Sequence, residues 1–209
     1  MIAVIDYAAG NLASVLRALE HLGHPAAITW DPDAIRKADR VILPGVGAAR
    51  ATMHNLRDRG LDVLLREEIY PRGTPFLGIC IGVQVIFDHS EEEDTPCLGI
   101  VKGRVKRFPA GTRDGERLKI PQIGWNQVEF RKPHPIFTGI EHGQSFYFVN
   151  SYYAVPTSDE VVYATTTYGV EFASVIGQNN LVATQFHLEK SGPVGLRMLD
   201  NFCRWDGKL

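Results

Sequence analysis

The stretch Gly78-Ile79-Cys80-Ile81-Gly82-Val83-Gln84 decides how the rest of the chain is interpreted. An apolar run, Thr74 to Ile79, leads into it and predicts a buried strand, and a helical pattern, Val83 to Asp88, leads out of it. A cysteine at a strand-to-helix corner, with glycine two residues before it and two residues after it, has the form of a nucleophile elbow.

The two glycines of this motif are required for steric reasons. The corner is so tight that a side chain at Gly78 or Gly82 would collide with the backbone or with a neighbouring strand. The bend raises the Cys80 sulfur above the end of the sheet and over the amino end of a helix, where backbone N–H groups and the helix dipole favour thiolate over thiol. For the motif taken alone, a buried structural cysteine between two turn glycines is the alternative.

The composition is that of an ordinary globular protein. The 209 residues suit one large domain, and 44% of them are hydrophobic and 22% charged. A net charge of -2 argues against nucleic acid as a partner, and no apolar run approaches the roughly 20 residues that span a membrane. Met1 to Asp6 reads as a short strand rather than a signal peptide. Three widely spaced cysteines predict free thiols and therefore a reducing, cytoplasmic location. The cysteines and histidines show no metal-ligand spacing, so we expect no metal, and we expect no cofactor.

Strands and helices alternate through the first half of the chain. This alternation predicts a parallel sheet with helices on both faces. Sites in such sheets form beyond the carboxyl ends of the strands, where the loops Asp6–Asn11 and Pro44–Ala48 and the elbow all lie. The predicted strands are Ile2–Ile5, Ala26–Trp30, Arg40–Leu43 and Thr74–Ile79; the predicted helices are Leu12–Leu22 with Asn11 as N-cap, Pro32–Ala38, and Ala49–Tyr70 broken near Gly60.

The second half of the chain is rich in β-branched and aromatic residues, with turn signals such as Asp114-Gly115. It predicts an antiparallel extension of the same domain, so that residues 1–209 form a single domain. The acidic turn Glu91–Asp94 is expected to be a solvated loop. The predicted strands are Gly103–Phe108, Gln127–Phe130, Gln144–Asn150, Val161–Thr166, Ala173–Ile176 and Leu181–Gln185, followed by a last helix, Gly192–Trp205.

A cysteine nucleophile needs a base within hydrogen-bond reach, and that base needs an orienting group. The segment Gln185–Glu189 offers both. Residues two apart on extended backbone share a face, so His187 and Glu189 can lie side by side with Leu188 turned inward. A surface histidine and a surface glutamate at the end of a strand are the alternative.

The tetrahedral intermediate of such a reaction needs preorganised N–H donors. Ile81, directly after the cysteine, offers one at the start of the helix. Gly45-Val46-Gly47 offers another, because the flanking glycines allow the Val46 N–H to turn inward. A plain turn between strand and helix is the alternative for this loop.

Two stretches, Gly78–Gln84 and Phe186-His187-Leu188-Glu189-Lys190-Ser191, resemble the class I, or triad, glutamine amidotransferases. Within that family, four further stretches are similar, in order and spacing, to the glutaminase subunits of imidazole glycerol phosphate synthases. These stretches are Asp6–Leu12, Pro44–Ala48, Pro121–Asn126 and Tyr147–Tyr152. The resemblance implies a flavodoxin-like class I glutamine amidotransferase fold: α/β, with a mostly parallel central sheet flanked by helices and an antiparallel β extension.

The resemblance also implies roles for single residues. Cys80 would attack the carboxamide of L-glutamine and form a glutamyl thioester, with His187 moving the protons and Glu189 orienting His187. The N–H groups of Val46 and Ile81 would hold the oxyanion. Substrate contacts are implied for Gly47, Gln84 and Ser151.

Members of this group dock on a (β/α)8 cyclase subunit as a heterodimer and pass ammonia to it, because ammonia set free in water becomes ammonium, which has no lone pair to attack with. The assembled enzyme makes imidazole glycerol phosphate and AICAR in histidine biosynthesis. The positions implied to lie near that interface are Asn11, Trp125, Tyr147 and Lys190.

The chain departs from the family pattern without losing a triad side chain. Leu188 stands where proline is usual, Gln122-Ile123 where His-Met is usual, and Asn150 where histidine is usual. In the elbow, Ile81 and Val83 stand where leucine and methionine are typical. The alternatives that stay open are the same chemistry serving another acceptor pathway such as sugar amidination, a non-catalytic binding subunit, and a thiol hydrolase acting on peptides or thioesters.

Overall fold

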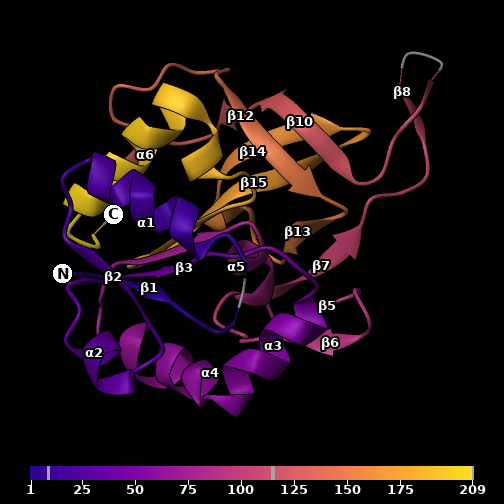
Figure 1. Ribbon diagram of the computed structural model, residues 1–209. Coiled ribbons are helices and arrows are strands. Elements are labelled where there is room, and N and C mark those ends of the chain that lie inside the picture. Colours follow the sequence, from indigo (N-terminus) through magenta and orange to yellow (C-terminus); the bar gives the residue numbers. More distant parts are fainter. Residues whose placement is uncertain (9, 114–115, 209) are drawn as a thin grey trace.

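The computed structural model describes residues 1–8, 10–113 and 116–208. Its centre is a block of parallel strands in the order β2-β1-β3-β4-β16 (Figure 1). These strands are β1 (Ile2–Ile5), β2 (Ala26–Thr29), β3 (Arg40–Leu43), β4 (Phe76–Ile79) and β16 (Leu181–Thr184). The first four coincide closely with the predicted strands. β1, β3 and β4 are apolar runs that the fold buries, whereas β2, at the edge of the sheet, is half-buried.

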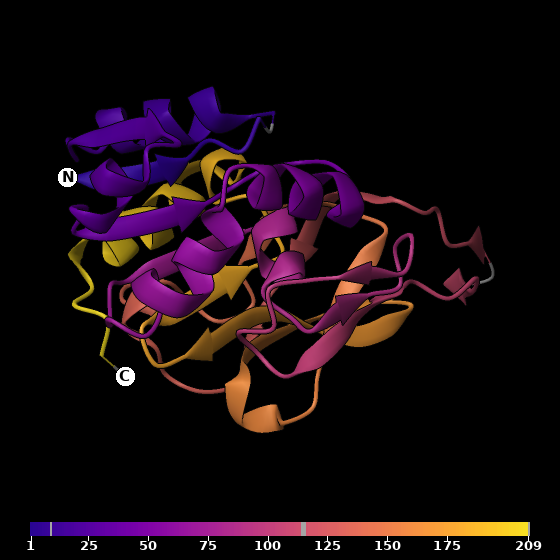
Figure 2. The same cartoon turned by 90° about the horizontal axis from the view of Figure 1, so that it is seen from below.

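Helices cover both faces of these strands, as the alternation predicts. In Figure 1, α1 (Leu12–His21) and α6 (Gly192–Arg204) lie above the sheet, and α2 (Pro32–Arg36), α3 (Ala49–Asp58) and α4 (Leu61–Val63) lie below it. Seen from below, the purple helices α3 and α4 lie in front of the sheet (Figure 2). The break predicted near Gly60 is confirmed, because Gly60 adopts a left-handed conformation with φ 65° between α3 and α4.

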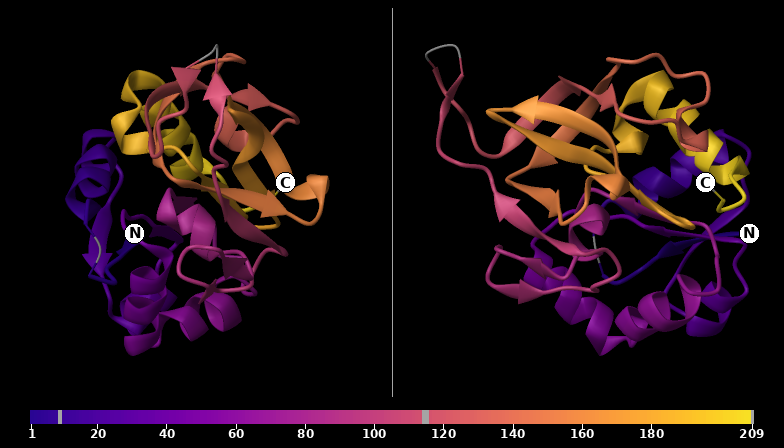
Figure 3. Two further views of the ribbon diagram at one scale, coloured as in Figure 1. Left: turned by 90° about the vertical axis from the view of Figure 1, so that its right-hand side faces the viewer. Right: turned by 180° about the vertical axis from the view of Figure 1, so that it is seen from behind.

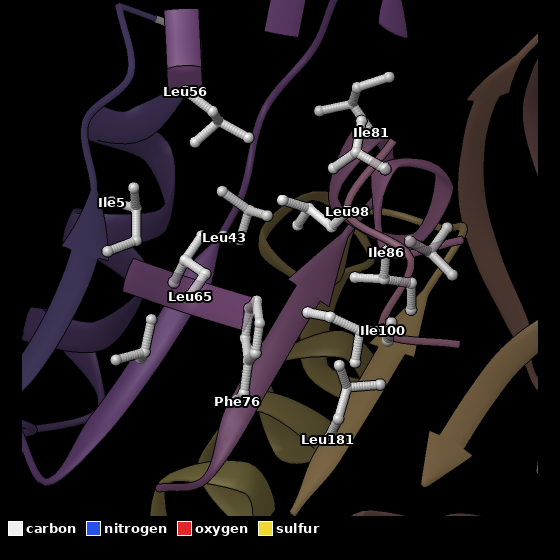
Figure 4. Packing of buried hydrophobic residues seen from close by; sticks show 14 of the residues in the cluster. Ile5, Leu43, Leu56, Leu65, Phe76, Ile81, Ile86, Leu98, Ile100 and Leu181 are labelled. Atoms are coloured by element: carbon white, nitrogen blue, oxygen red, sulfur yellow. The ribbon is translucent and has the colours of Figure 1, made fainter. Parts of the chain in front are cut away.

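The two faces of β1 show how the sheet divides the core. Ala3 and Ile5 pack into the cluster on one face, and Ile2 and Val4 pack into the cluster on the other. Figure 4 shows the first of these clusters, in which side chains of the strands meet those of the covering helices. Its labelled members include Ile5, Leu43, Phe76 and Leu181 from strands and Leu56 from α3.

The second half of the chain continues the same sheet with antiparallel strands. β15 (Val170–Gln178) pairs antiparallel with β16 and with β13 (Tyr152–Pro156), and β13 pairs antiparallel with β7 (Gly103–Arg107). The predicted antiparallel extension is therefore confirmed for these strands, but β16, which was predicted as part of it, pairs parallel with β4 and closes the parallel block. The remaining strands of this sheet are β5 (His89–Ser90), β6 (Thr95–Pro96), β11 (Glu129–Phe130) and β14 (Val162–Tyr168).

Two smaller ribbons stand outside the large sheet. β10 (Gln122–Gln127) pairs antiparallel with β12 (Ser145–Asn150), and the hairpin of β8 (Thr112–Arg113) and β9 (Glu116–Arg117) projects from the body (Figure 3). The sequence analysis did not predict β10 and β13, nor the two-residue strands β5, β6, β8 and β9. The turn expected at Asp114-Gly115 lies outside the described residues, as does Ala9 in the loop after β1. Within the described ranges, none of the helices combines the length and apolar character needed to cross a membrane.

Candidate functional site

Cys80 lies between β4 and the short helix α5 (Ile81–Val85) with φ 56° and ψ −103°, a conformation that non-glycine residues rarely adopt. The steric argument for its two glycines is confirmed. A Cβ at Gly78 would lie 3.0 Å from Ala183 Cβ, and one at Gly82 would lie 2.1 Å from the carbonyl oxygen of Leu43. The helix begins two residues earlier than the pattern Val83–Asp88 predicts and ends at Val85.

The Cys80 sulfur is enclosed by chain segments distant in sequence. The backbone N–H of Cys80 donates to Thr184 O at 2.8 Å, which ties the elbow to the end of β16. Sγ lies 3.7 Å from Val149 O, a weak S–H···O contact, and 3.9 Å from Nε2 of Gln185. The residue is only 6% exposed, so its thiol is reached through the pocket described below.

His187 and Glu189 form the predicted pair. His187 Nδ1 lies 2.8 Å from Glu189 Oε1, and the two side chains are 1% and 0% exposed, which rules out a surface pair. Leu188 is fully buried, as expected. The backbone differs from the prediction: only His187 is extended, and Leu188–Lys190 form a 3₁₀ turn. This turn still brings the carboxylate back to the imidazole.

The segment that carries His187 is held by β12. The His187 N–H donates to Tyr147 O at 2.9 Å, and the Tyr147 N–H donates to Ser191 Oγ at 2.9 Å. The Ser191 hydroxyl in turn donates to His187 O. These three bonds fix the backbone on both sides of the 3₁₀ turn and so fix where the imidazole points.

The imidazole of His187 lies beside the Cys80 sulfur. Burial by itself lowers the pKa of His187, but the neighbouring Cys80 sulfur and Glu189 carboxylate outweigh it and raise the pKa to about 9. Burial raises the pKa of Glu189, but the imidazole and a hydrogen bond from Asn11 outweigh it, so the net direction is downward. Nε2 of His187 makes no aligned hydrogen bond to any described residue, which leaves it available for proton transfer.

A cavity of about 230 Å³ opens in front of the sulfur. It brings together all six of the pocket residues implied by the resemblance: Val46, Gly47, Cys80, Ile81, Gln84 and Ser151. The loop after β3 lines one side, with φ 151° at Gly45 and φ 128° at Gly47. Both angles favour glycine, which explains why this loop carries two.

Gln84 is buried, not an exposed helix residue, with 5% of its surface accessible. Its Nε2 donates to Tyr152 O at 3.3 Å and to Gln185 Oε1 at 3.2 Å. Gln185 is itself fully buried, and its Nε2 contacts the Cys80 sulfur. The side-chain amide of Gln185 therefore connects Gln84 with Cys80. Sequence reasoning missed Gln185, although its place directly before Phe186-His187 could have indicated it.

Glu92 is a charged residue of the pocket whose place sequence reasoning missed. The acidic turn was expected to be a solvated loop, yet the Glu92 carboxylate lines the cavity and accepts a hydrogen bond from the Ala49 N–H, 2.7 Å away at the start of α3. Burial raises the pKa of Glu92, although the Ala49 N–H acts in the opposite direction. In the sequence, Glu92 cannot be distinguished from its three acidic neighbours.

The residues implied to face a partner lie close together around this site. Trp125 is 58% exposed and packs edge-on against Tyr147 with 6.0 Å between ring centroids, and its neighbour Ile123 is 64% exposed. Lys190 is exposed and directly follows Glu189. Ile123, Trp125 and Tyr147 form an apolar surface on β10 and β12 beside the pocket, and Lys190 adds a charge from the 3₁₀ turn.

Asn11 occupies the predicted N-cap position of α1 but does not cap the helix with its side chain. It adopts a left-handed conformation, φ 72°, and its side chain makes no N-cap hydrogen bond to α1. Its Nδ2 donates instead to Glu189 Oε1 at 2.6 Å. The sequence pattern could not show that a residue 178 positions away would compete for this amide.

No cluster of His, Cys, Asp or Glu in residues 1–8, 10–113 and 116–208 is arranged to hold a metal ion. A larger cavity, about 920 Å³, lies beside the strand Gln122–Gln127 and shares only Pro121 with the pocket at Cys80. None of its described lining residues is a cysteine, serine or threonine, so the chemistry places the candidate active site at the smaller cavity.

Comparison with known proteins agrees with this arrangement. The family model described as glutamine amidotransferase class-I matches residues 3–205. A Dehalococcoides mccartyi protein named imidazole glycerol phosphate synthase subunit HisH is 52% identical over 203 residues, which cover 97% of this chain and 96% of that protein. A protein of the same name from Geobacillus thermodenitrificans is 48% identical, covering 97% of this chain and 94% of that protein.

Solved structures show the same fold at low identity. A crystal structure of a glutamine amidotransferase has a TM-score of 0.75 at 18% identity and covers 98% of each chain. The glutaminase domain of Trypanosoma brucei CTPS with bound acivicin has a TM-score of 0.66 at 16% identity and covers 98% of this chain and 94% of that one. The fold and the match over nearly the whole length lead to one conclusion: the chain belongs to the class-I glutamine amidotransferase family.

Proposed function

We propose that this chain is the glutaminase subunit of an imidazole glycerol phosphate synthase, with Cys80, His187 and Glu189 as its catalytic triad. The observation that carries the proposal is the strained cysteine beside a buried His187–Glu189 pair, at the end of a pocket of about 230 Å³. The two relatives described above, each about half identical over nearly the whole chain, bear the name of that subunit.

The proposed reaction has two halves. His187 accepts the thiol proton as the Cys80 sulfur attacks the carboxamide carbon of L-glutamine, and it gives this proton to the departing ammonia as the C–N bond breaks. The glutamyl thioester that remains is then attacked by water, which His187 activates by accepting its proton. The C–S bond breaks, His187 returns this proton to the sulfur so that the thiol is restored, and glutamate leaves. Glu189 stabilises the imidazolium formed in each half, which its 2.8 Å contact with Nδ1 supports.

Substrate binding follows from the residues around the pocket. The N–H groups of Val46 and Ile81 are proposed to hold the oxyanion, with Gly47, Gln84 and Ser151 contacting the glutamine. Glu92 places a carboxylate in the same pocket, which suits the α-ammonium group of an amino acid. A pocket that is lined by the sulfur, by the proposed N–H donors and by a carboxylate favours glutamine over a peptide or a thioester.

The partner in this proposal is a (β/α)8 cyclase subunit that receives the ammonia and makes imidazole glycerol phosphate and AICAR in histidine biosynthesis. The exposed apolar surface of Ile123 and Trp125, together with Tyr147, Lys190 and Asn11, supports docking beside the pocket. We also propose a heterodimer in the cytoplasm, and a single amidotransferase domain over residues 1–209, which the sheet continuing through both halves supports.

A second candidate keeps the chemistry and changes the acceptor. Gln122 and Asn150, which replace the family's usual histidines, face each other across β10 and β12 and are both buried. Such a pair beside the docking surface could suit the subunit of another pathway, such as sugar amidination. A non-catalytic binding subunit is disfavoured, because all three triad side chains are present and His187 and Glu189 are in contact.

The test is glutamate formation by the purified chain, alone and with the cyclase and its nucleotide ligand. We expect slow hydrolysis by the chain alone and strong acceleration by the complex. Cys80→Ala should abolish hydrolysis and still bind the cyclase. Equal turnover with and without the cyclase would argue for another acceptor partner, and full activity of Cys80→Ala would refute the chemistry.

A further inference from the structure

The loop between β1 and α1 carries an amide that reaches the buried carboxylate of the active site. Asn11 Nδ2 donates to Glu189 Oε1 at 2.6 Å, whereas its side chain makes no hydrogen bond to its own helix. The left-handed backbone at Asn11, φ 72° and ψ 8°, explains the choice. Asparagine tolerates this conformation better than most residues, and here it turns the side chain away from α1 and towards Glu189.

The hydrogen bonds of Glu189 show why this amide matters. The side chain is fully buried, and a buried carboxylate stays ionised only where charges or donors compensate for lost water. Oε1 accepts from both His187 Nδ1 and Asn11 Nδ2, while Oε2 has no partner among the described residues. Among the described residues, Asn11 is therefore the one side chain besides His187 that donates to this carboxylate, and it lowers the pKa of Glu189.

We propose that Asn11 is a positioning residue for glutamine hydrolysis: it holds the Glu189 carboxylate ionised and in place, and through it the orientation of His187. This role is separate from contact with a partner, which the family resemblance implies for the same residue. Because it concerns the proposed glutaminase reaction, it rests on the proposed function, and its test needs one readout that does not require glutamine.

The variant that isolates the amide is Asn11→Gly. Glycine removes the donor and accepts the left-handed conformation without strain, so the loop keeps its course. Asn179→Gly is a matched control, because Asn179 is also left-handed, φ 52°, and also donates its Nδ2, to Tyr70 at 3.0 Å. Asn179 lies in the turn before β16, at the amino ends of the parallel strands, whereas Cys80 lies at their carboxyl ends.

The activity test uses the complex at saturating cyclase, so that weaker docking does not enter. We expect Asn11→Gly to lower kcat about tenfold with KM for glutamine changed by less than about twofold, the pattern of lost transition-state stabilisation. In a Glu189→Ala background the same change should lower kcat by less than about twofold, because its target is absent. Asn179→Gly should leave kcat unchanged.

The second readout is the titration of the Glu189 carboxyl carbon by ¹³C NMR in the isolated chain, assigned by its loss in Glu189→Ala. It should move to higher pH in Asn11→Gly and stay in place in Asn179→Gly. The proposal is overturned if the titration does not move, or if Asn11→Gly lowers kcat equally in both backgrounds. A wild-type complex that does not hydrolyse glutamine would refute the proposed function, while the titration would still decide the Asn11–Glu189 contact.

Discussion

Replacing Gly82 with alanine tests whether close packing of α5 against β3 fixes the nucleophile elbow. A Cβ at this position would lie 2.1 Å from the carbonyl oxygen of Leu43 and 3.3 Å from its carbonyl carbon. Leu43 is the last residue of β3 and is followed directly by the loop that carries Val46. The helix must therefore move away from β3 and take Cys80 with it.

The size of the effect follows from that distance. The new carbon would have to move by about 1.3 Å to reach the 3.4 Å of ordinary van der Waals contact. Overpacking costs about 1–3 kcal/mol, and we expect about 3 kcal/mol here because the obstacle is backbone. Helix propensity alone would give the opposite sign, a gain of about 1 kcal/mol for alanine over glycine. A displacement of this order should lower glutaminase activity about 100-fold.

The assay is urea unfolding of the isolated chain, together with glutaminase activity of the complex. We expect a lower midpoint at an unchanged slope for Gly82→Ala. Gly78→Ala should have a smaller effect, because its Cβ would lie 2.9–3.0 Å from its nearest neighbours. A Gly82→Ala variant as stable and active as the wild type would refute this account of the elbow.

Three further predictions concern acid stability, the loop after β3 and the docking surface. His134 packs among aromatic rings, and burial lowers its pKa to about 4, so the unfolded chain takes up a proton that the folded chain does not. The free energy of unfolding should therefore be highest above about pH 6.5 and lower by about 3 kcal/mol at pH 4. Urea unfolding of His134→Phe should show a weaker dependence on pH. Tyr7→Phe removes a buried hydrogen bond of 2.8 Å from the Tyr7 hydroxyl to the Pro44 carbonyl in the loop after β3. It should lower the free energy of unfolding by about 1–3 kcal/mol, measured with urea, and lower kcat. Unchanged values would show that this bond does not hold the loop. Trp125→Ala should change stability by less than about 0.5 kcal/mol but weaken cyclase binding by about 2 kcal/mol in calorimetry, and wild-type affinity would exclude it from the interface.

The parallel part of the fold could be predicted because its signals are local. The four strands of the first half are short runs bounded by turn residues, and burial on both faces makes β1, β3 and β4 continuously apolar, whereas the edge strand β2 is half-buried. The antiparallel strands were harder. β13 follows β12 after the single residue Ser151, and the run of apolar and aromatic residues gives no turn signal there. Its existence depends on pairing with β7 and β15, which lie far away in sequence.

The residues of the site also divide into those that local sequence patterns indicate and those that long-range contacts place. The elbow and the His187–Glu189 pair carry local patterns, and the pocket gathers the residues that these patterns and the family resemblance indicate. Glu92 and Asn11 were misjudged because their roles come from long-range contacts. The first reaches the start of α3, and the second reaches Glu189. A solvated acidic turn and a helix N-cap are sound local expectations that tertiary contacts override.

The central claim is that the sulfur at the bend and the buried imidazole act together on glutamine, and covalent labelling tests it most directly. The chain, with its cyclase, is treated with a glutamine-mimicking electrophile at neutral pH, and the adduct is located by mass spectrometry. We expect one adduct, on Cys80, prevented by free glutamine and lost in His187→Asn. Burial raises the pKa values of Cys97 and Cys203 to about 12, so both thiols should stay unlabelled. No adduct on Cys80, or one that neither glutamine nor His187→Asn affects, would contradict the account.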